Sequence, residues 1–198
     1  MSWSLCLIFS YILGAVPFGY LVGRYLGTDI RKFGSGNIGT TNAFRVLGAG
    51  PGLVVLFGDV AKGVIPVLLG SRVGGPTLAV LAGILAVIGH NWPIFLKFRG
   101  GRGVATGAGM LIALAPLVTL ICFSVWIVVV LTTRYVSLGS IVAACSAPIV
   151  MLLLHQPWQF VLVTILLALV IVWRHRPNLK RLLAGTEYKL GDRVGKSN

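Results

Sequence analysis

Residues 117–131, LVTLICFSVWIVVVL, contain no charged side chain, no glycine and no proline. They lie within a mostly apolar stretch, residues 104–173, which is much longer than one membrane crossing, since a helix needs about 20 residues to span a core of about 30 Å. Three breaks divide this stretch: Ala-Pro at 115–116, Thr-Thr-Arg-Tyr at 132–135 and His-Gln-Pro at 155–157. The pattern predicts several helices that cross a membrane in succession.

Further apolar runs occupy residues 3–23, 52–70 and 77–96. The chain has 198 residues, of which 57% are hydrophobic and 11% charged, and this apolar content exceeds what a soluble domain can bury. We therefore predict an all-α, polytopic integral membrane protein, with residues 1–198 forming a single membrane-embedded domain. Pro17 is expected to kink the first apolar run.

The distribution of charge predicts the orientation of the chain. Seventeen Lys and Arg oppose four acidic residues, and the net charge is +13. Such a net charge could indicate a protein that binds nucleic acid, but the cytoplasmic loops of membrane proteins are also enriched in Lys and Arg. Basic clusters flank residues 104–173, so an even number of crossings lies between them, and four crossings also place Arg134 inside. We predict about seven transmembrane helices, an outer N-terminus, a cytoplasmic C-terminus and no nucleic-acid partner; only Arg72 then lies outside and Lys62 within a span.

The first polar loop, residues 32–45, reads KFGSGNIGTTNAFR. Its glycines can adopt positive φ and expose successive backbone N–H groups. Several neutral donors accompany them: Ser35, Asn37, Thr40, Thr41 and Asn42. Arg45 adds a planar fork suited to phosphate. Together these groups predict an anion site, although a flexible polar loop is the alternative for this stretch taken alone.

The glycine-rich segment, residues 98–109, reads FRGGRGVATGAG. Gly100, Gly101 and Gly103 precede an apolar helix, whose N-terminal N–H groups could face an anion. Arg99 and Arg102 supply positive charge. The segment matches neither the Walker phosphate loop nor the dinucleotide fingerprint, so by itself it indicates an anion without identifying it.

The basic tail, residues 174–191, reads RHRPNLKRLLAGTEYKLG. His175 and Asn178 are three positions apart among basic residues, and an amphipathic tail lying on anionic lipid is the alternative interpretation. Within the second apolar run, Asp59 and Lys62 share one helical face. Ionisable residues inside a membrane are costly and often functional, but a structural ion pair is an equal alternative.

Four motifs in order carry a family resemblance: GSGNIGTTNAFR at 34–45, DVAKG at 59–63 followed by Pro66, GHNWPIFLKFRGGRGVAT at 89–106 and HRPNLKRLLAGTE at 175–187. They resemble the bacterial acyl-phosphate-dependent glycerol-3-phosphate acyltransferases, the PlsY family. The resemblance implies transfer of a long-chain acyl group from acyl phosphate to the 1-hydroxyl of glycerol 3-phosphate. It implies lysophosphatidic acid and phosphate as products, and membrane lipids as further partners. It also implies an active site on the cytoplasmic face of a bacterial cell (inner) membrane, and no metal or cofactor.

The resemblance also implies roles for individual residues. His175, Asn178 and Ser35 would act at the reacting centre. Phosphate and glycerol 3-phosphate would be bound by Asn37, Thr41, Arg45, Gly100, Gly101, Arg102 and Gly103. Ser140 looks similar to a polar residue that lines the same cavity. Glu187 would hold the tail in place. Independently of the resemblance, we interpret Asp59 and Lys62 as structural residues, because their spacing suits an ion pair. Family members usually carry Lys at the positions of Arg99 and Arg102, so charge is kept while its geometry changes.

The residues also constrain the chemistry. Acyl phosphate is a mixed anhydride with a good leaving group, so no covalent enzyme intermediate is needed, and the sequence contains no Gly-x-Ser-x-Gly elbow. Positioning and charge neutralisation would supply most of the rate. Either His175 or the donor's own phosphate could take the proton. A small membrane carrier for phosphorylated metabolites is the alternative function, but no pair of interrupted helices suggests alternating access.

Overall fold

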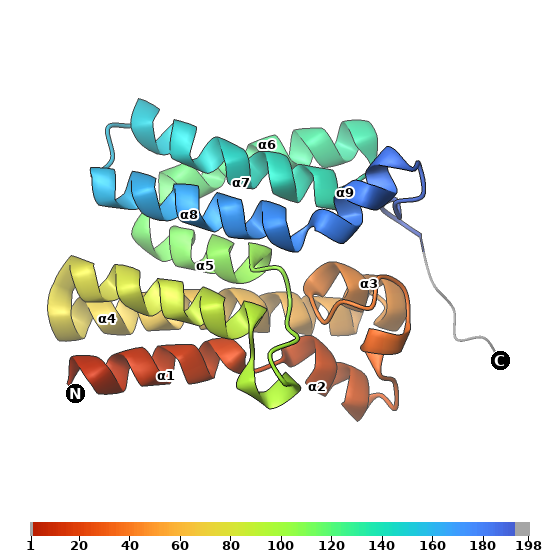
Figure 1. Cartoon of the computed structure of the whole chain (residues 1–198), viewed down its shortest axis with the longest axis horizontal. Coiled ribbons are helices and arrows are strands. Elements are labelled where there is room, and N and C mark those ends of the chain that lie inside the picture. Colours follow the sequence, from red (N-terminus) through yellow and green to blue (C-terminus); the bar gives the residue numbers. More distant parts are fainter. Residues whose placement is uncertain (1, 193–198) are drawn as a thin grey trace. The chain divides into compact units, whose positions relative to one another are not determined.

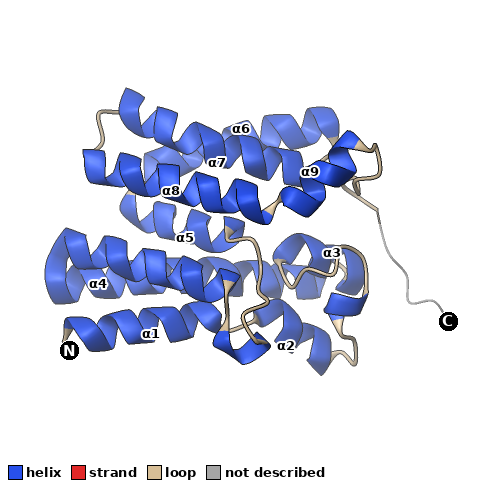
Figure 2. Ribbon diagram, viewed as in Figure 1, coloured by secondary structure: helices blue, strands red, loops and turns tan. Residues whose placement is uncertain are grey.

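The computed structural model describes residues 2–192, which consist of helices, turns and loops without a strand (Figure 2). This confirms the all-helical prediction. Arg193 and Lys196, the last two basic residues of the chain, lie outside the described residues. The described chain forms two compact units, the N-terminal unit (residues 2–114) and the C-terminal unit (residues 115–192). The grouping of residues 1–198 into a single functional domain stays a prediction.

The N-terminal unit opens with α1 (Trp3–Ala15) and α2 (Phe18–Tyr25), which are bent by 43° where Val16 and Pro17 separate them. Proline has no N–H and its ring crowds the preceding turn, so it interrupts the helical hydrogen bonds. The predicted kink at Pro17 is confirmed. A short 3-10 helix at Ile30–Lys32 and then α3 (Thr40–Leu47) follow, and they frame the first polar loop.

The next element, α4 (Ala49–Asn91), is a hairpin of two helices (Figure 1). Its helical backbone breaks at residues 74–75, and Gly75 has a φ of +71° that favours glycine. Two pairs of positions face each other across the hairpin: Gly70 with Leu78, and Gly83 with Val67. The residue numbers fall from 70 to 67 on one arm while those of their partners rise from 78 to 83 on the other, so the arms are antiparallel. They correspond to the predicted apolar runs 52–70 and 77–96.

The second arm of α4 ends at Asn91, five residues before the end of the apolar run 77–96. Pro93 explains the difference, because the residue before a proline is driven out of the helical region. Trp92 accordingly has φ −131° and ψ 65°. The apolar residues that follow form the 3-10 helix Ile94–Leu96 instead.

The last helix of the N-terminal unit, α5 (Val104–Leu114), packs closely on α4. Glycines on both helices permit this approach. A Cβ atom on Gly63 of α4 would overlap the carbonyl oxygen of Thr106, and a Cβ atom on Gly109 of α5 would overlap that of Val60. The start of α5 is therefore held against the stretch of α4 that contains Asp59 and Lys62.

The C-terminal unit contains four helices: α6 (Pro116–Thr133), α7 (Val136–Leu153), α8 (Trp158–Arg174) and α9 (Arg176–Leu183). The breaks before α6, α7 and α8 fall at the three predicted places, each where Pro or a polar cluster interrupts the apolar sequence. Helices α8 and α9 are bent by 57° relative to each other.

Several helices are suited to a membrane. Three are long and apolar enough to cross one, and five qualify if each bent pair, α1 with α2 and α8 with α9, counts as one span. Leu131 and Leu153 are both 72% exposed, and Leu169 is 63% exposed. Large apolar side chains in such number on the surface are expected where lipid rather than water is the solvent.

Candidate active site

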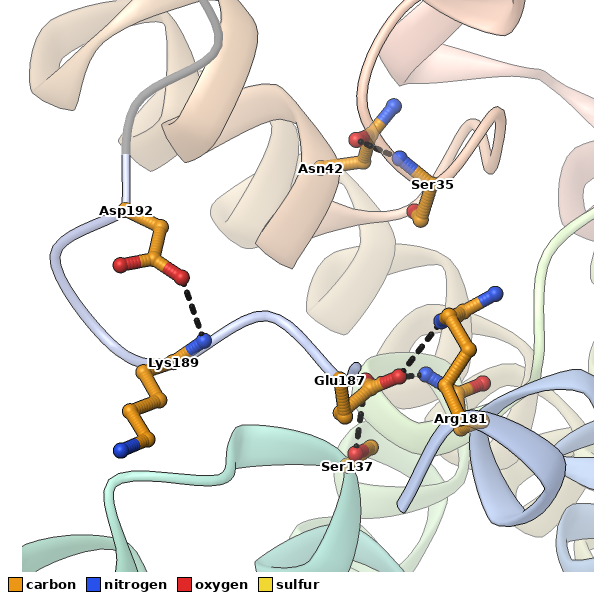
Figure 3. A network of polar contacts seen from close by, with 8 residues as sticks. Ser35, Asn42, Ser137, Arg181, Glu187, Lys189 and Asp192 are labelled. Carbon is orange, nitrogen blue, oxygen red and sulfur yellow. Dashed lines mark hydrogen bonds and ion pairs between the residues drawn. The ribbon is translucent and has the colours of Figure 1, made fainter. Parts of the chain in front are cut away.

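Asn42, on α3, closes the first polar loop. Its Oδ1 accepts a hydrogen bond from the N–H of Ser35 at 3.0 Å, as Figure 3 shows. Its Nδ2 donates to three backbone carbonyls: Ile30 at 3.0 Å, Phe33 at 3.2 Å and Asn37 at 2.9 Å. Because this buried amide is used within the loop, the expectation that Asn42 adds a donor for an anion is wrong. The residue shapes the site instead.

The other polar residues of the first polar loop are more accessible. Ser35, Asn37 and Arg45 are partly buried, and Thr41 is exposed. The side-chain oxygen of Asn37 accepts the N–H of Gly39 at 3.2 Å, which orients its amide at the start of α3. Gly34 and Gly36 have positive φ, as the sequence suggested. Side-chain hydroxyl, amide and guanidinium groups thus lie within one short stretch of backbone.

The glycine-rich segment begins beside the first polar loop in the N-terminal unit. Leu96, just before this segment, shares a buried cluster with Ile30 and Ile38, which flank the loop's first residues. The structure therefore brings together the first two polar clusters, which are more than fifty residues apart in the sequence. Lys97 and Phe98 both adopt left-handed φ values, of 51° and 60°, to make the turn between this cluster and the glycines.

The N–H groups of Gly100 and Gly101 are used within the protein. They donate to the carbonyl oxygens of Asn91 at 3.2 Å and His90 at 3.0 Å. These two N–H groups are thus used within the protein, and the contact of Gly100 and Gly101 with glycerol 3-phosphate stays a prediction. Gly103, with φ +80°, leads into α5, whose first-turn N–H groups have no partner within the helix.

Asp59 and Lys62 form a buried ion pair in α4. Lys62 Nζ lies 2.8 Å from Asp59 Oδ1, and the two side chains are only 1% and 3% exposed. His90, on the other arm of the hairpin, places its Nδ1 3.6 Å from the same carboxylate oxygen. The sequence pointed to the pair but not to His90, because nothing in the spacing shows that α4 folds back on itself.

Glu187 connects three parts of the C-terminal unit (Figure 3). Its Oε1 accepts hydrogen bonds from Ser137 Oγ of α7 at 2.9 Å and from Asn178 Nδ2 of α9 at 2.6 Å. Its Oε2 pairs with Arg181 Nε at 2.7 Å. A carboxylate side chain that is 5% exposed thus has three donors, as a buried charge requires. These contacts fix residue 187 of the basic tail to α7 and α9.

His175 lies at the junction of α8 and α9 and is 3% exposed. Its Nδ1 is 2.8 Å from the carbonyl oxygen of Ile171. A carbonyl only accepts, so Nδ1 carries a proton, and in the neutral imidazole Nε2 is then the basic nitrogen. Asn178, one turn further on, is 2% exposed, and its Oδ1 has no hydrogen-bond partner among the described residues.

The place of Ser140 in the lining of the substrate cavity stays a prediction. This residue lies in α7. It is buried, and its hydroxyl donates to the carbonyl of Val136 in its own helix at 2.9 Å. Ser137, one turn earlier, makes the contact with Glu187 instead. Arg134, between α6 and α7, binds the tail in another way, since its guanidinium donates to the carbonyl of Leu190 at 3.0 Å. Sequence reasoning missed Ser137, which carries no signal beyond being a small polar residue in an apolar helix.

Positive charge dominates the polar segments of both units. Asp29, one of the few acids, is paired with Arg31 at 2.7 Å, and the hydrogen bond from this guanidinium lowers the pKa of the carboxyl to about 2. Asp59 and Glu187 are likewise paired. Among residues 2–192 no group of three His, Cys, Asp or Glu side chains could hold a metal ion. The excess of basic side chains suits the binding of an anion such as phosphate.

Comparison with known proteins identifies the class of membrane enzyme to which the chain belongs. A sequence model described as glycerol-3-phosphate acyltransferase matches residues 4–185. The chain is 56% identical to glycerol-3-phosphate acyltransferase 2 of Moorella thermoacetica over 96% of its own length and 99% of that protein's. It is 50% identical to the glycerol-3-phosphate acyltransferase of Rubrobacter xylanophilus over 96% of each chain. The chain belongs to the glycerol-3-phosphate acyltransferase family.

Two solved structures are similar to the whole chain. Both are crystal structures of PlsY (YgiH), described as an integral membrane glycerol 3-phosphate acyltransferase, at 39% sequence identity. Its glycerol 3-phosphate form has a TM-score of 0.92 and covers 96% of each chain. Its lysophosphatidic acid form has a TM-score of 0.90 and covers 97% of each chain. The resemblance to the PlsY family is thereby confirmed.

Proposed function

We propose that this protein transfers a long-chain acyl group from acyl phosphate to the 1-hydroxyl of glycerol 3-phosphate, with lysophosphatidic acid and phosphate as products. One observation carries the proposal. The structurally similar PlsY is described in a glycerol 3-phosphate form and a lysophosphatidic acid form, and these two molecules differ by a single acyl group. They are therefore the acceptor and the product of one acyl transfer.

The N-terminal unit supplies the groups that suit phosphate. In the first polar loop, Ser35, Asn37, Thr41 and Arg45 offer neutral and cationic donors close together. In the glycine-rich segment, Arg102 and Gly103 stand at the start of α5, where the helix dipole and the first-turn N–H groups favour an anion. We assign glycerol 3-phosphate to Arg102 and Gly103, and the phosphate of the donor to the first polar loop.

The C-terminal unit supplies the groups that suit the reacting hydroxyl. His175 Nε2 would accept the proton of the 1-hydroxyl, whose oxygen attacks the acyl carbon. A new C–O ester bond forms, the C–O bond of the mixed anhydride breaks, and phosphate leaves. The side-chain oxygen of Asn178, which Glu187 orients through Nδ2, would accept a hydrogen bond from the acceptor. The alternative, in which the donor's phosphate takes the proton, needs no base on the protein.

The donor class follows from what the reaction needs. An acyl phosphate already carries a good leaving group, so preorganised charge and positioning suffice for its transfer. Both substrates are phosphate monoesters or anhydrides, and cationic side chains outnumber acids by 17 to 4 in the chain. The acyl tail would remain among the apolar helices, where each buried methylene contributes about 0.8 kcal/mol.

We place the protein in a bacterial cell membrane with seven crossings, an outer N-terminus and its polar segments in the cytoplasm. The two arms of α4, the two bent pairs, α6, α7 and the short α5 support this count. The basic residues that flank the helices support the orientation, because cytoplasmic loops are enriched in Lys and Arg.

The test uses the purified protein in detergent with palmitoyl phosphate and labelled glycerol 3-phosphate, and palmitoyl coenzyme A in a parallel reaction. We expect labelled lysophosphatidic acid with palmitoyl phosphate alone. Product only with palmitoyl coenzyme A would overturn the proposed donor. With neither donor active and the protein folded, uptake of labelled glycerol 3-phosphate into proteoliposomes would support a carrier instead.

A further inference from the structure

The buried ion pair of α4 lies directly behind the glycine-rich segment. Asp59 and Lys62 are on the first arm, and His90 is at the end of the second arm. From there the chain makes its turn and returns, so that Gly100 and Gly101 donate to the carbonyls of Asn91 and His90. The charged pair and the segment are thus separated by one residue, His90.

The backbone of the glycine-rich segment packs against the imidazole ring of His90 at Gly101. A Cβ atom on Gly101 would overlap the ring at Nε2, so the backbone of the segment touches the ring itself. A Cβ atom on Gly103 would lie 3.0 Å from the side-chain amide of Asn91. The ring of His90 therefore limits the position of the backbone at Gly101, and the side chain of Asn91 limits it at Gly103.

The ion pair lies beside that ring, within ion-pair distance of its Nδ1. Asp59 Oδ1 lies 3.6 Å from His90 Nδ1 and 2.8 Å from Lys62 Nζ. Lys62 in turn donates to the carbonyl of Val16 at 2.9 Å, at the bend between α1 and α2. All three side chains are at most 3% exposed. Paired charges so deeply buried have fixed positions, because each has few alternative partners.

We infer that Asp59, Lys62 and His90 are positioning residues for glycerol 3-phosphate, which act by fixing the backbone of residues 100–103. The inference rests on the proposed function, which assigns this substrate to Arg102 and Gly103. A purely structural ion pair would support the whole fold equally. A positioning network instead affects one substrate more than the other, because the donor's phosphate is assigned to the first polar loop.

The main test compares two variants with a matched control. Asp59→Asn/Lys62→Met removes both charges together, since loss of only one would leave an unpaired buried charge. His90→Phe keeps a ring beneath Gly101 but removes the nitrogen that faces Asp59. Leu78→Ala is the control, because Leu78 is fully buried in α4 within a separate apolar cluster with Cys6 and Ala82.

We expect the KM for glycerol 3-phosphate to rise about ten- to a hundredfold in the double variant, and less in His90→Phe, with the KM for palmitoyl phosphate unchanged. Amide hydrogen exchange in a peptide covering residues 97–105 should become faster in both variants but not in Leu78→Ala. This second measurement needs no substrate. If the double variant does not fold, His90→Phe decides the question alone.

Two results would overturn the inference: equal changes in both KM values, or exchange in residues 97–105 that matches the control. Failure of the proposed function would look different. If the proposed function fails, the unaltered protein forms no lysophosphatidic acid from palmitoyl phosphate. If only the inference fails, the unaltered protein remains active, and the variants keep the same ratio of the KM values for the two substrates.

Discussion

The side-chain amide of Asn178 donates a hydrogen bond of 2.6 Å to Oε1 of Glu187, nine residues further along the chain. Its oxygen is thereby turned away from the carboxylate and has no partner among the described residues. Because a carboxylate only accepts hydrogen bonds, it binds the NH₂ end of Asn178 and leaves the side-chain oxygen to accept from a donor, which we propose is the glycerol hydroxyl. A residue of the tail thus orients a residue of the proposed reacting centre.

We predict that Glu187→Gln lowers kcat at least about tenfold and destabilises the protein by about 2 kcal/mol, the range for hydrogen bonds to a charged group. The neutral amide loses the ion pair with Arg181 and can present an N–H to the donors Ser137 and Asn178. Initial rates and the thermal midpoint in detergent measure the two effects. Asp192→Asn is the control, because within residues 2–192 this exposed carboxylate accepts a side-chain hydrogen bond only from the N–H of Lys189. An equal loss in both variants would contradict the prediction.

Asn42→Ala should raise the KM for palmitoyl phosphate by about tenfold or more, because the first polar loop loses the amide that closes it. It also leaves backbone groups of the loop without partners, at a cost of about 1–3 kcal/mol for each buried group. Steady-state kinetics with each substrate varied in turn would measure the change. Gln156→Ala removes an amide whose contact is local, to the carbonyl of Leu154, and should leave both KM values unchanged. Unchanged kinetics in Asn42→Ala would show that the loop does not depend on this residue.

The helices and their breaks could be predicted because they depend on local sequence. The breaks before α6, α7 and α8 follow from Pro116, Arg134 and Pro157, which interrupt long apolar runs. The end of α4 does not coincide with the end of the apolar run, because the apolar residues after Pro93 form a 3-10 helix and do not continue α4. There the restriction imposed by proline on its neighbour outweighs apolar composition.

Parts of the site that depend on long-range contacts could not be predicted. His90 meets Asp59 only because α4 turns back at residues 74–75. The side chain of Asn42 could donate a hydrogen bond to a substrate as judged from the sequence. Only the three-dimensional course of the loop shows that its NH₂ group already donates to three backbone carbonyls. The motifs therefore identified the family, whereas the contacts within each segment needed the structure.

The pair of Asp29 and Arg31 predicts a pH dependence of stability. The pKa of Asp29 is lowered to about 2 from its ordinary value of 3.8, chiefly by the hydrogen bond from Arg31. A lowered carboxyl pKa stabilises the folded state above the ordinary value, and the contribution is lost as the pH falls through the folded value. We expect Asp29→Asn to be less stable than the natural protein by at most about 1 kcal/mol at pH 6, since the pair is partly exposed. The difference should shrink between pH 4 and pH 2.

Thermal midpoints of both proteins at constant ionic strength would measure this difference. Arg31→Gln should reduce stability at pH 6 to a similar extent, because it removes the other half of the same pair. A difference between Asp29→Asn and the natural protein that stays constant from pH 6 to pH 2 would contradict the assignment.

His175 offers the sharpest test of the mechanism, because its two nitrogens have different tasks. Nδ1 donates to the carbonyl oxygen of Ile171. Nε2 is the nitrogen that we propose accepts the proton of the glycerol 3-phosphate hydroxyl. His175→Asn keeps a donor near the position of Nδ1 but has no equivalent of Nε2. If His175 is the general base, both His175→Asn and His175→Ala lower kcat by about 10²–10⁴-fold. If the donor's phosphate takes the proton, His175→Asn loses about tenfold or less. His155→Asn is the control, since His155 is exposed in the turn between α7 and α8, and asparagine tolerates its φ of 50°.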